Sequence, residues 1–415
     1  MAEEERLHQA RKSVGLGLAD YIAQPDMVRL RAYRMGRFQA ELKRRDYGGA
    51  ILYDPINIRY ATGSRNMAVW TLHNPARYAF VPVEGKAVIF DFHNCEHLSQ
   101  GIETIGEVRP ASSWVFFSAG NRSAEKVREW GKEMAALIKE RCGANRRIAV
   151  DCLDHLGGKQ LEAAGFELFD AQEVSERARA IKSPDEIACM NHALAVCEAG
   201  MARMQEALRP GITENELFAL LSDTNMRMGG EWMECRLLSS GGRTNPWFQE
   251  ASDRVVRPGD LVSFDTDLIG PFGYCADISR TFFCGPGRAS PQQRKLFGLA
   301  MEQIHANLDL VRPGISFREF SEKAWRIPNA YVANRYSCVF HGVGLCDEWP
   351  KAAHVHDAES SAYDGVLEEN MTICIESYIG EEGGTEGVKL EQQVLVTPSG
   401  CQILTTFPFD EKLSG

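Results

Sequence analysis

Three aspartates within one short apolar stretch constrain the fold of this chain more than any other feature. Residues 262–281 read VSFDTDLIGPFGYCADISRT, which predicts two strands joined by a turn at residues 270–273. Acidic residues disfavour strands, so Asp265, Asp267 and Asp277 need a reason to lie between apolar flanks. One interpretation is the polar edge of a solvated hairpin. The other is a carboxylate cage for divalent metal ions, because aspartate oxygens suit Mg, Mn, Fe and Zn.

The spacing within this hairpin limits how the three acids can meet. In an alternating strand Asp265 and Asp267 point to the same face, as two metal ligands should. A hairpin that is symmetric about residues 270–273 places Asp277 opposite Thr266, on the other face. We therefore expect a one-residue bulge that brings the three carboxylates together.

Three more candidate ligands follow, each in a strand-like run. His341 opens a His-Gly-Val-Gly sequence, Glu376 ends an apolar strand, and Glu391 lies midway through another. A glutamate inside a hydrophobic strand is costly to bury unless it is paired or ligated. Each residue alone is more often a surface group or an ion-pair partner. The ordered set Asp, Asp, His, Glu, Glu favours a metal site.

The remaining pattern predicts two domains. A chain of 415 residues is longer than one typical domain of roughly 150. Helical periodicity over residues 26–45 and strand-like runs at 49–53, 78–83 and 86–90 indicate an α/β domain. A new helix is then predicted to start at Ser183-Pro184, with acids in its first turn. We expect a smaller amino-terminal α/β domain over residues 1–180 and a second domain over 181–415.

Charge and composition exclude several classes of protein. Lys and Arg total 46 against 57 Asp and Glu, a net charge of −11 without a basic block, so nucleic acid and anionic membranes are not expected partners. No apolar run approaches the roughly 18 residues that span a bilayer. The opening residues MAEEERLHQARKSVG lack the pattern of a secretory signal, so we expect a cytoplasmic protein. The 12 cysteines form no CxxC pair and are expected to be reduced.

The ordered ligand set resembles the pita-bread metallohydrolases, which include methionine aminopeptidase, prolidase, aminopeptidase P and creatinase. The resemblance covers about residues 184–405, and the first half is similar to the smaller amino-terminal domain of prolidase and creatinase, notably at residues 55–60. It implies an α+β chain with a carboxy-terminal pita-bread catalytic domain. It also implies two divalent metal ions, held by Asp265, Asp267, Asp277, His341, Glu376 and Glu391.

Two departures from the peptidase pattern argue against peptide hydrolysis. Peptidases of this fold carry a substrate-contacting histidine eighteen residues before the first metal aspartate, and that position is Trp247 here. They carry another histidine after the His-Gly-Val-Gly run, where this chain has Asp347 and Glu348. An Xaa-Pro dipeptidase or aminopeptidase is therefore the alternative function rather than the leading one.

The altered residues favour a different chemistry. A dinuclear centre can bind a substrate carboxylate and stabilise the charge that develops when its α-proton is removed by a nearby Asp or Glu acting as the general base. An aromatic wall suits a permanently cationic leaving group, with a cation–π attraction of about 0.5–2 kcal/mol. Trp247, Tyr336 and Trp349 flank the motifs and are the candidates for such a wall, although Trp247 fits simple wall packing equally well.

These features resemble the DddP-type lyases, which cleave dimethylsulfoniopropionate (DMSP) to dimethyl sulfide and acrylate. The match includes Asp265-Thr266-Asp267, the run from Tyr336 through His341 to Asp347, and the two late glutamates. The resemblance implies a homodimer, iron as the metal and Asp347 as the base. Glu348, seven residues after His341, is the second candidate for the base. Mn or Zn also suits this ligand set, so the metal stays open.

Overall fold

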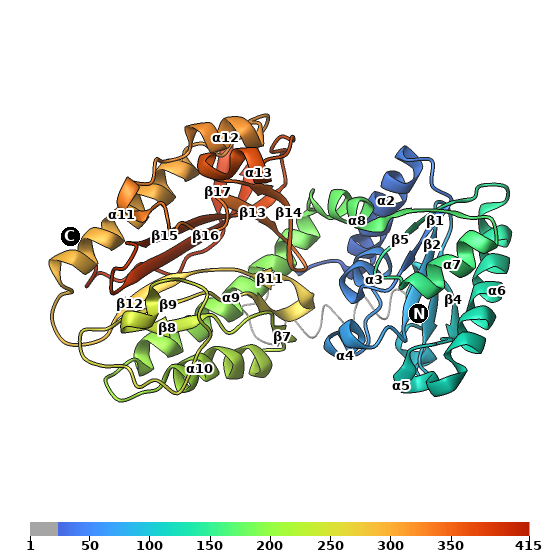
Figure 1. The fold of residues 1–415 in the computed structure, drawn as a ribbon, viewed down its shortest axis with the longest axis horizontal. Coiled ribbons are helices and arrows are strands. Elements are labelled where there is room, and N and C mark those ends of the chain that lie inside the picture. The colour runs from blue at the N-terminus through green and yellow to red at the C-terminus, as the bar shows by residue number, and fades with distance from the viewer. Residues whose placement is uncertain (1–23, 415) are drawn as a thin grey trace.

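The amino-terminal lobe is built on a six-stranded sheet with the strand order β4-β3-β2-β1-β5-β6 (Figure 1). The computed structural model describes residues 24–414. Strands β1, β2 and β3 are antiparallel neighbours, whereas β4, β5 and β6 each pair in parallel. The strands are β1 (Gly49–Leu52), β2 (Tyr78–Pro82), β3 (Ala87–Asp91), β4 (Ile105–Pro110), β5 (Arg147–Val150) and β6 (Glu167–Asp170).

Helices cover both faces of this sheet, which confirms the α/β prediction. One face packs an aromatic cluster that includes Tyr78, Trp114 and Trp130, and the other contributes to a core that continues into the second lobe. Between the predicted strands, residues 55–60 form a helix capped by Asp54. The helices are α2 (Met27–Arg44), α3 (Pro55–Thr62), α4 (Ala68–His73), α5 (Phe116–Ala119), α6 (Ser123–Cys142), α7 (His155–Ala163) and α8 (Ala171–Arg179).

The carboxy-terminal lobe places its sheets between two sets of helices (Figure 1). Its sheets have the orders β11-β10-β7, β12-β9-β8 and β14-β13-β15-β16-β17. The strands are β7 (Trp232–Met233), β8 (Leu238–Ser240), β9 (Leu261–Phe264), β10 (Leu268–Ile269), β11 (Cys275–Ala276), β12 (Arg280–Phe283), β13 (Phe340–Val343), β14 (Asp347–Ala352), β15 (Thr372–Gly380), β16 (Gly387–Thr397) and β17 (Gly400–Ile403). The helices are α9 (Pro184–Ala207), α10 (Glu214–Arg227), α11 (Pro291–Leu308), α12 (Phe317–Lys323) and α13 (Ala358–Ser361).

The start of α9 follows the signal in the sequence. The Ser183 side chain accepts a hydrogen bond from the Glu186 amide, and the Glu186 carboxylate accepts one from the Ser183 amide. This capping box satisfies two backbone donors that the first helical turn leaves unpaired, and Pro184 at the first helical position needs no donor. The predicted helix start at residues 183–184 is confirmed.

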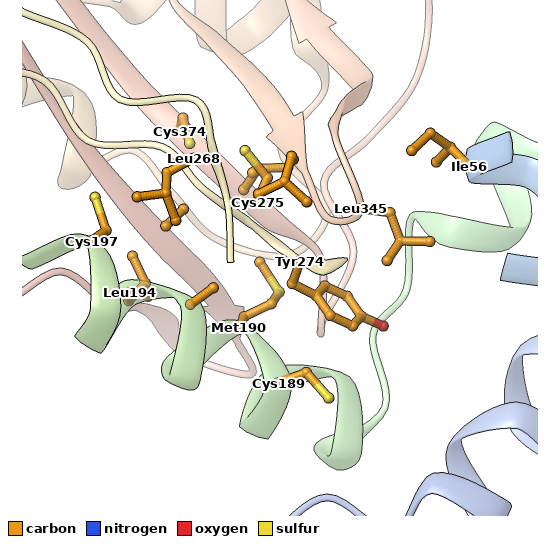
Figure 2. Packing of buried hydrophobic residues seen from close by; sticks show 14 of the residues in the cluster. Ile56, Cys189, Met190, Leu194, Cys197, Leu268, Tyr274, Cys275, Leu345 and Cys374 are labelled. Atoms are coloured by element: carbon orange, nitrogen blue, oxygen red, sulfur yellow. The ribbon is translucent and has the colours of Figure 1, made fainter. Parts of the chain in front are cut away.

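The two lobes share buried contacts. Figure 2 shows Ile56 of the first lobe near Leu345 of the second, with Tyr274 beside the start of α9. The Arg34 guanidinium is buried and donates to the Tyr274 hydroxyl, which in turn donates to Glu186 at 2.9 Å. Because these polar groups satisfy one another out of water, they fix how α2 lies against α9.

Three other sequence predictions concern membrane-spanning segments, the opening residues and the cysteines. No helix in residues 24–414 is both long and apolar enough to cross a membrane. The prediction drawn from the opening residues lies in residues 1–23, outside the described part of the chain. The 12 cysteines all lie within the described part and all are free thiols.

Candidate active site

The hairpin of β9 to β12 gathers the three aspartates without the expected bulge. Phe264 pairs with Arg280 and Leu268 pairs with Ala276, so the register is the same on both sides of the acids. The turn between Ile269 and Cys275 holds one residue more than a turn over 270–273 would, which places Asp277 opposite Asp267 rather than Thr266. The prediction of a bulge was wrong. A carboxylate oxygen of each of Asp265, Asp267 and Asp277 lies within 4.8 Å of the others.

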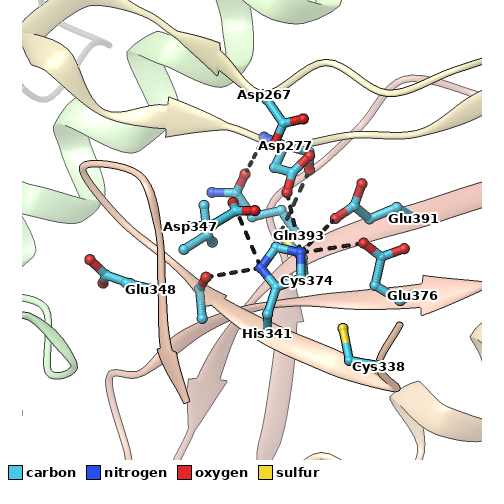
Figure 3. Close-up of polar contacts among 12 residues, drawn as sticks. Asp267, Asp277, Cys338, His341, Asp347, Glu348, Cys374, Glu376, Glu391 and Gln393 are labelled. Atoms are coloured by element: carbon cyan, nitrogen blue, oxygen red, sulfur yellow. Dashed lines mark hydrogen bonds and ion pairs between the residues drawn. The ribbon is translucent and has the colours of Figure 1, made fainter. Parts of the chain in front are cut away.

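The five-stranded sheet supplies the other candidate ligands from one of its faces. His341 on β13 pairs with Cys374 on β15, and Glu376 on β15 pairs with Glu391 on β16. Cys374 and Glu376 are two residues apart in one strand, so both point to the same side. The structure therefore brings all six predicted ligands together, and Figure 3 shows Asp267, Asp277, His341, Glu376 and Glu391 among them.

The His341 ring lies at the centre of this cluster. Its Nε2 atom is 3.3 Å from Glu376, 3.4 Å from Asp277 and 3.6 Å from Glu391 (Figure 3). Two overlapping groups have ligand atoms within 4.8 Å of one another. The first is Asp277, His341, Cys374 and Glu391, and the second is Asp265, Glu376 and Glu391.

The donor set fits divalent cations. One oxygen of Asp277 and one of Glu391 are buried without a hydrogen-bond partner, which is costly unless something else contacts them. Burial first, and then neighbouring carboxylates, raise the pKa values of Asp267 and Asp277 well above normal. Burial likewise raises the pKa of Glu376 to about 8. Buried acids this close together ionise fully only when cations compensate them.

Lys389 already supplies one positive charge, and the sequence analysis missed it. Its buried Nζ atom contacts Glu376 at 2.6 Å, Asp265 at 3.2 Å and Glu391 at 3.6 Å. Burial alone would raise the pKa of Glu391, but Lys389 and His341 outweigh it and hold that pKa well below normal. Lys389 lies two residues before Glu391 in one strand, so the period of two placed both on one face.

Three uncharged or weakly acidic side chains also form hydrogen bonds with the acidic residues. Ser279 donates to Asp265 at 2.7 Å, and its hydroxyl also lies 2.9 Å from Glu391. Gln393 accepts from the Asp277 amide at 3.1 Å, and the Cys235 thiol donates to Asp267 at 2.8 Å. The sequence did not indicate that these three residues contact the acids, because the contacts depend on how the strands pair.

Asp347 and Glu348 lie in different environments although they are adjacent. The Asp347 side chain is 53% exposed, and its Oδ1 atom is 3.7 Å from Nδ1 of His341. The Glu348 side chain is fully buried in ion pairs with Arg179 and Lys182. A cavity of about 450 Å³ opens beside His341; its lining includes Asp347, Tyr336, Trp349, Lys351 and Tyr363.

The structure separates the three predicted wall aromatics. Tyr336 and Trp349 line the cavity, whereas Trp247 is buried outside its lining. The rings of Tyr336 and Trp247 face the Lys389 ammonium, with centroids at 4.5 and 5.9 Å. Trp349 is covered on one side by the Arg177 guanidinium at 4.1 Å.

Comparison with known proteins identifies the family. Residues 188–398 match metallopeptidase family M24, and residues 34–181 match the creatinase/prolidase N-terminal domain. The chain is 41% identical to the dimethylsulfoniopropionate lyase DddP of Roseovarius nubinhibens, over 95% of this chain and 90% of the relative. It is 39% identical to the enzyme of the same name from Roseobacter denitrificans, over 94% and 89%.

Solved structures share the fold at lower identity. An Xaa-Pro dipeptidase from Bacillus anthracis is 21% identical, with a TM-score of 0.74 over 91% of this chain and 98% of that one. A prolidase from Pyrococcus horikoshii is 20% identical, with a TM-score of 0.72 over 91% and 99%. These structural similarities establish the pita-bread fold. The two relatives at about 40% identity also identify the family within that fold. The chain belongs to the family of the dimethylsulfoniopropionate lyases DddP, within the wider group of creatinase-like and M24 proteins.

Proposed function

We propose that this chain is a carbon–sulfur lyase that cleaves DMSP to dimethyl sulfide and acrylate in a metal-dependent reaction. The observation that carries the proposal is the position of Asp347. A half-exposed carboxylate stands at the mouth of a buried acidic centre, beside a cavity large enough for a small zwitterion. The relatives at 41% and 39% identity bear the name of this activity.

Asp347 is proposed as the general base. It takes a proton from the carbon next to the substrate carboxylate, and that electron pair forms the carbon–carbon double bond of acrylate. The carbon–sulfur bond breaks, and its electron pair leaves with neutral dimethyl sulfide. Asp347 then returns the proton to solvent across its exposed side. Glu348 is unsuited to this step, because Arg179 and Lys182 already hold its buried carboxylate.

Asp265, Asp267, Asp277, His341, Glu376 and Glu391 are proposed to hold two divalent metal ions. The five carboxylates and the Lys389 ammonium together carry a charge of −4, which two divalent cations balance. When bound, such ions supply a Lewis-acid site for the substrate carboxylate and for the charge that develops beside it. Iron is the proposed metal on the family resemblance, and Mn or Zn suits the same ligands.

The cationic end of the substrate is proposed to lie against aromatic rings. Tyr336 and Trp349 line the cavity and offer π faces or edges to a sulfonium group. Trp247 is assigned an indirect part, because its ring packs against Tyr378 at 5.9 Å and faces Lys389. It also lies next to Phe248, whose ring stacks on Tyr336.

The remaining assignments of the proposal concern the whole chain. Residues 1–180 and 181–415 are its two domains, with the catalytic residues in the second. The assembly is proposed to be a homodimer on the family resemblance. The proposed location is cytoplasmic, which agrees with the twelve unpaired thiols.

Headspace gas chromatography tests the function. Purified protein with a quantified metal content is incubated with DMSP, and dimethyl sulfide and acrylate are measured together. Equal amounts of both products, lost on chelation and recovered on adding the metal, are expected. A metal-loaded sample that releases no dimethyl sulfide but hydrolyses an Xaa-Pro dipeptide would contradict the proposal and support the peptidase alternative.

A further inference from the structure

The position of Asp347 depends on its backbone. No hydrogen bond to its carboxylate occurs within residues 24–414, and the nearest charged partner is His341 at 3.7 Å. The pairing of β13 with β14 becomes irregular just after Asp347 and Glu348, because His341 pairs with Lys351 while the next residue, Gly342, pairs with Glu348. Two residues of β14 therefore bulge out of the ladder. The bulged residues are Trp349 and Pro350, so only the pairs Gly342–Glu348 and Val343–Asp347 hold the start of β14 in the ladder, and side-chain contacts add to that support.

Glu348 provides that support on the other side of the strand. Its side chain has no exposed surface, and its carboxylate forms ion pairs with Lys182 and, at 3.0 Å, with Nε of Arg179. Both cations are also buried. Gly344 lies so close that a Cβ atom there would collide with the Glu348 carboxylate. Charge and packing thus fix this side chain in one position.

The ion cluster reaches into the amino-terminal lobe. Arg179 donates to Asn57 of α3 at 2.6 Å and to Glu176 of α8 at 2.6 Å. The second oxygen of Glu176 accepts from the Trp349 amide at 2.8 Å. The two residues that follow Asp347 are therefore both tied to α8, at the junction of the lobes.

We propose that Glu348 is a positioning residue, which uses Arg179 and Lys182 of the lobe junction to hold Asp347 against the metal centre. The amino-terminal lobe then takes part in the reaction by fixing the base. This inference rests on the proposed function of Asp347. It assigns the second candidate base of the sequence analysis to a different task.

Glu348→Gln is the direct test, because the amide keeps the shape of the side chain and removes its charge. We expect kcat for dimethyl sulfide release to fall by about 10–100-fold, the range for a catalytic group displaced by about 1 Å. The KM for DMSP and the metal content per chain should stay as in the wild type. Lys182→Gln, which leaves Arg179 on the carboxylate, is the milder second variant and should show the same pattern to a smaller extent.

Glu231→Gln is the matched control. Glu231 also joins the two lobes through a largely buried ion pair, with both oxygens 2.8 Å from Arg59 and one of them 2.6 Å from Arg65, but it lies outside the cavity of Asp347. It should leave kcat unchanged. If carboxylates that join the lobes only stabilised the fold, kcat would fall to a similar extent in Glu348→Gln and Glu231→Gln.

Hydrogen-exchange mass spectrometry gives a readout that does not need activity. The peptide that spans residues 343–349 should exchange faster in Glu348→Gln and at the wild-type rate in Glu231→Gln. Unchanged exchange and unchanged kcat in Glu348→Gln would overturn the positioning role. A wild-type protein without lyase activity would instead refute the proposed function, whatever the exchange of this peptide shows.

Discussion

Lys389→Met tests how the acids at the centre are held together. The Lys389 ammonium is fully buried and has three carboxylate oxygens within 3.6 Å. Removal of one partner from a buried ion pair costs about 3–5 kcal/mol, because the remaining charge is left without compensation. The acids can take up protons instead, and Met refills most of the volume. We therefore expect a loss of about 3 kcal/mol, the lower end of this range, in the metal-free protein.

The assay is urea unfolding of chelator-treated protein, with and without added metal. Divalent cations would compensate the same carboxylates, so the effect of Lys389→Met should shrink when metal is present. Lys351→Met is the control, because Lys351 is exposed and forms no ion pair within the described residues; it should change stability by no more than about 0.5 kcal/mol. If metal-free Lys389→Met unfolds at the urea concentration of the wild type, the ammonium does not hold the acids.

Three further predictions follow from the site and its surroundings. Tyr336→Ala should raise the KM for DMSP by a factor of about 2–30, equivalent to 0.5–2 kcal/mol of cation–π attraction, and steady-state kinetics would contradict this if KM were unchanged. Adding metal at about 100 times its Kd to the metal-free protein should raise the free energy of unfolding by about 2.7 kcal/mol. Equal unfolding midpoints with and without metal would show that these residues do not bind metal. Burial lowers the pKa of His354 to about 4, so the folded state keeps this ring neutral while the unfolded state protonates it below about 6.5. Wild-type stability should therefore fall by roughly 3 kcal/mol more than that of His354→Gln as the pH drops from 6.5 to 4, and parallel pH profiles of the two proteins would contradict this.

The meeting of the candidate ligands was largely predictable from the sequence because they lie in strands or in the short segments that join strands. A period of two places Glu376 and Glu391 on one face of their sheet. The three aspartates lie in short irregular segments between strands, and Asp267 has a positive φ of 33°. The register of the hairpin was mispredicted because it depends on the length of the turn, and a turn with one more residue moved Asp277 to the correct face. Local composition does not reveal that length.

The surroundings of the centre were less predictable, since they depend on long-range packing. Lys389 looked like an ordinary polar residue in a strand, although its spacing from Glu391 gave the face it occupies. The ion pairs of Glu348 join residues more than 160 positions apart, and they exist only because the lobes dock at α8. Trp349 appeared equivalent to Trp247 in the sequence, yet only Trp349 lines the cavity.

The most direct measurement is the rate of dimethyl sulfide release by Asp347→Asn beside the wild type, with equal and quantified metal in both samples. General-base catalysis contributes about 10²–10⁴-fold, so the variant should lose activity by that factor while its metal content stays the same. A variant that keeps the full rate with metal bound would show that Asp347 is not the base. A wild-type protein that releases no dimethyl sulfide would contradict the lyase itself.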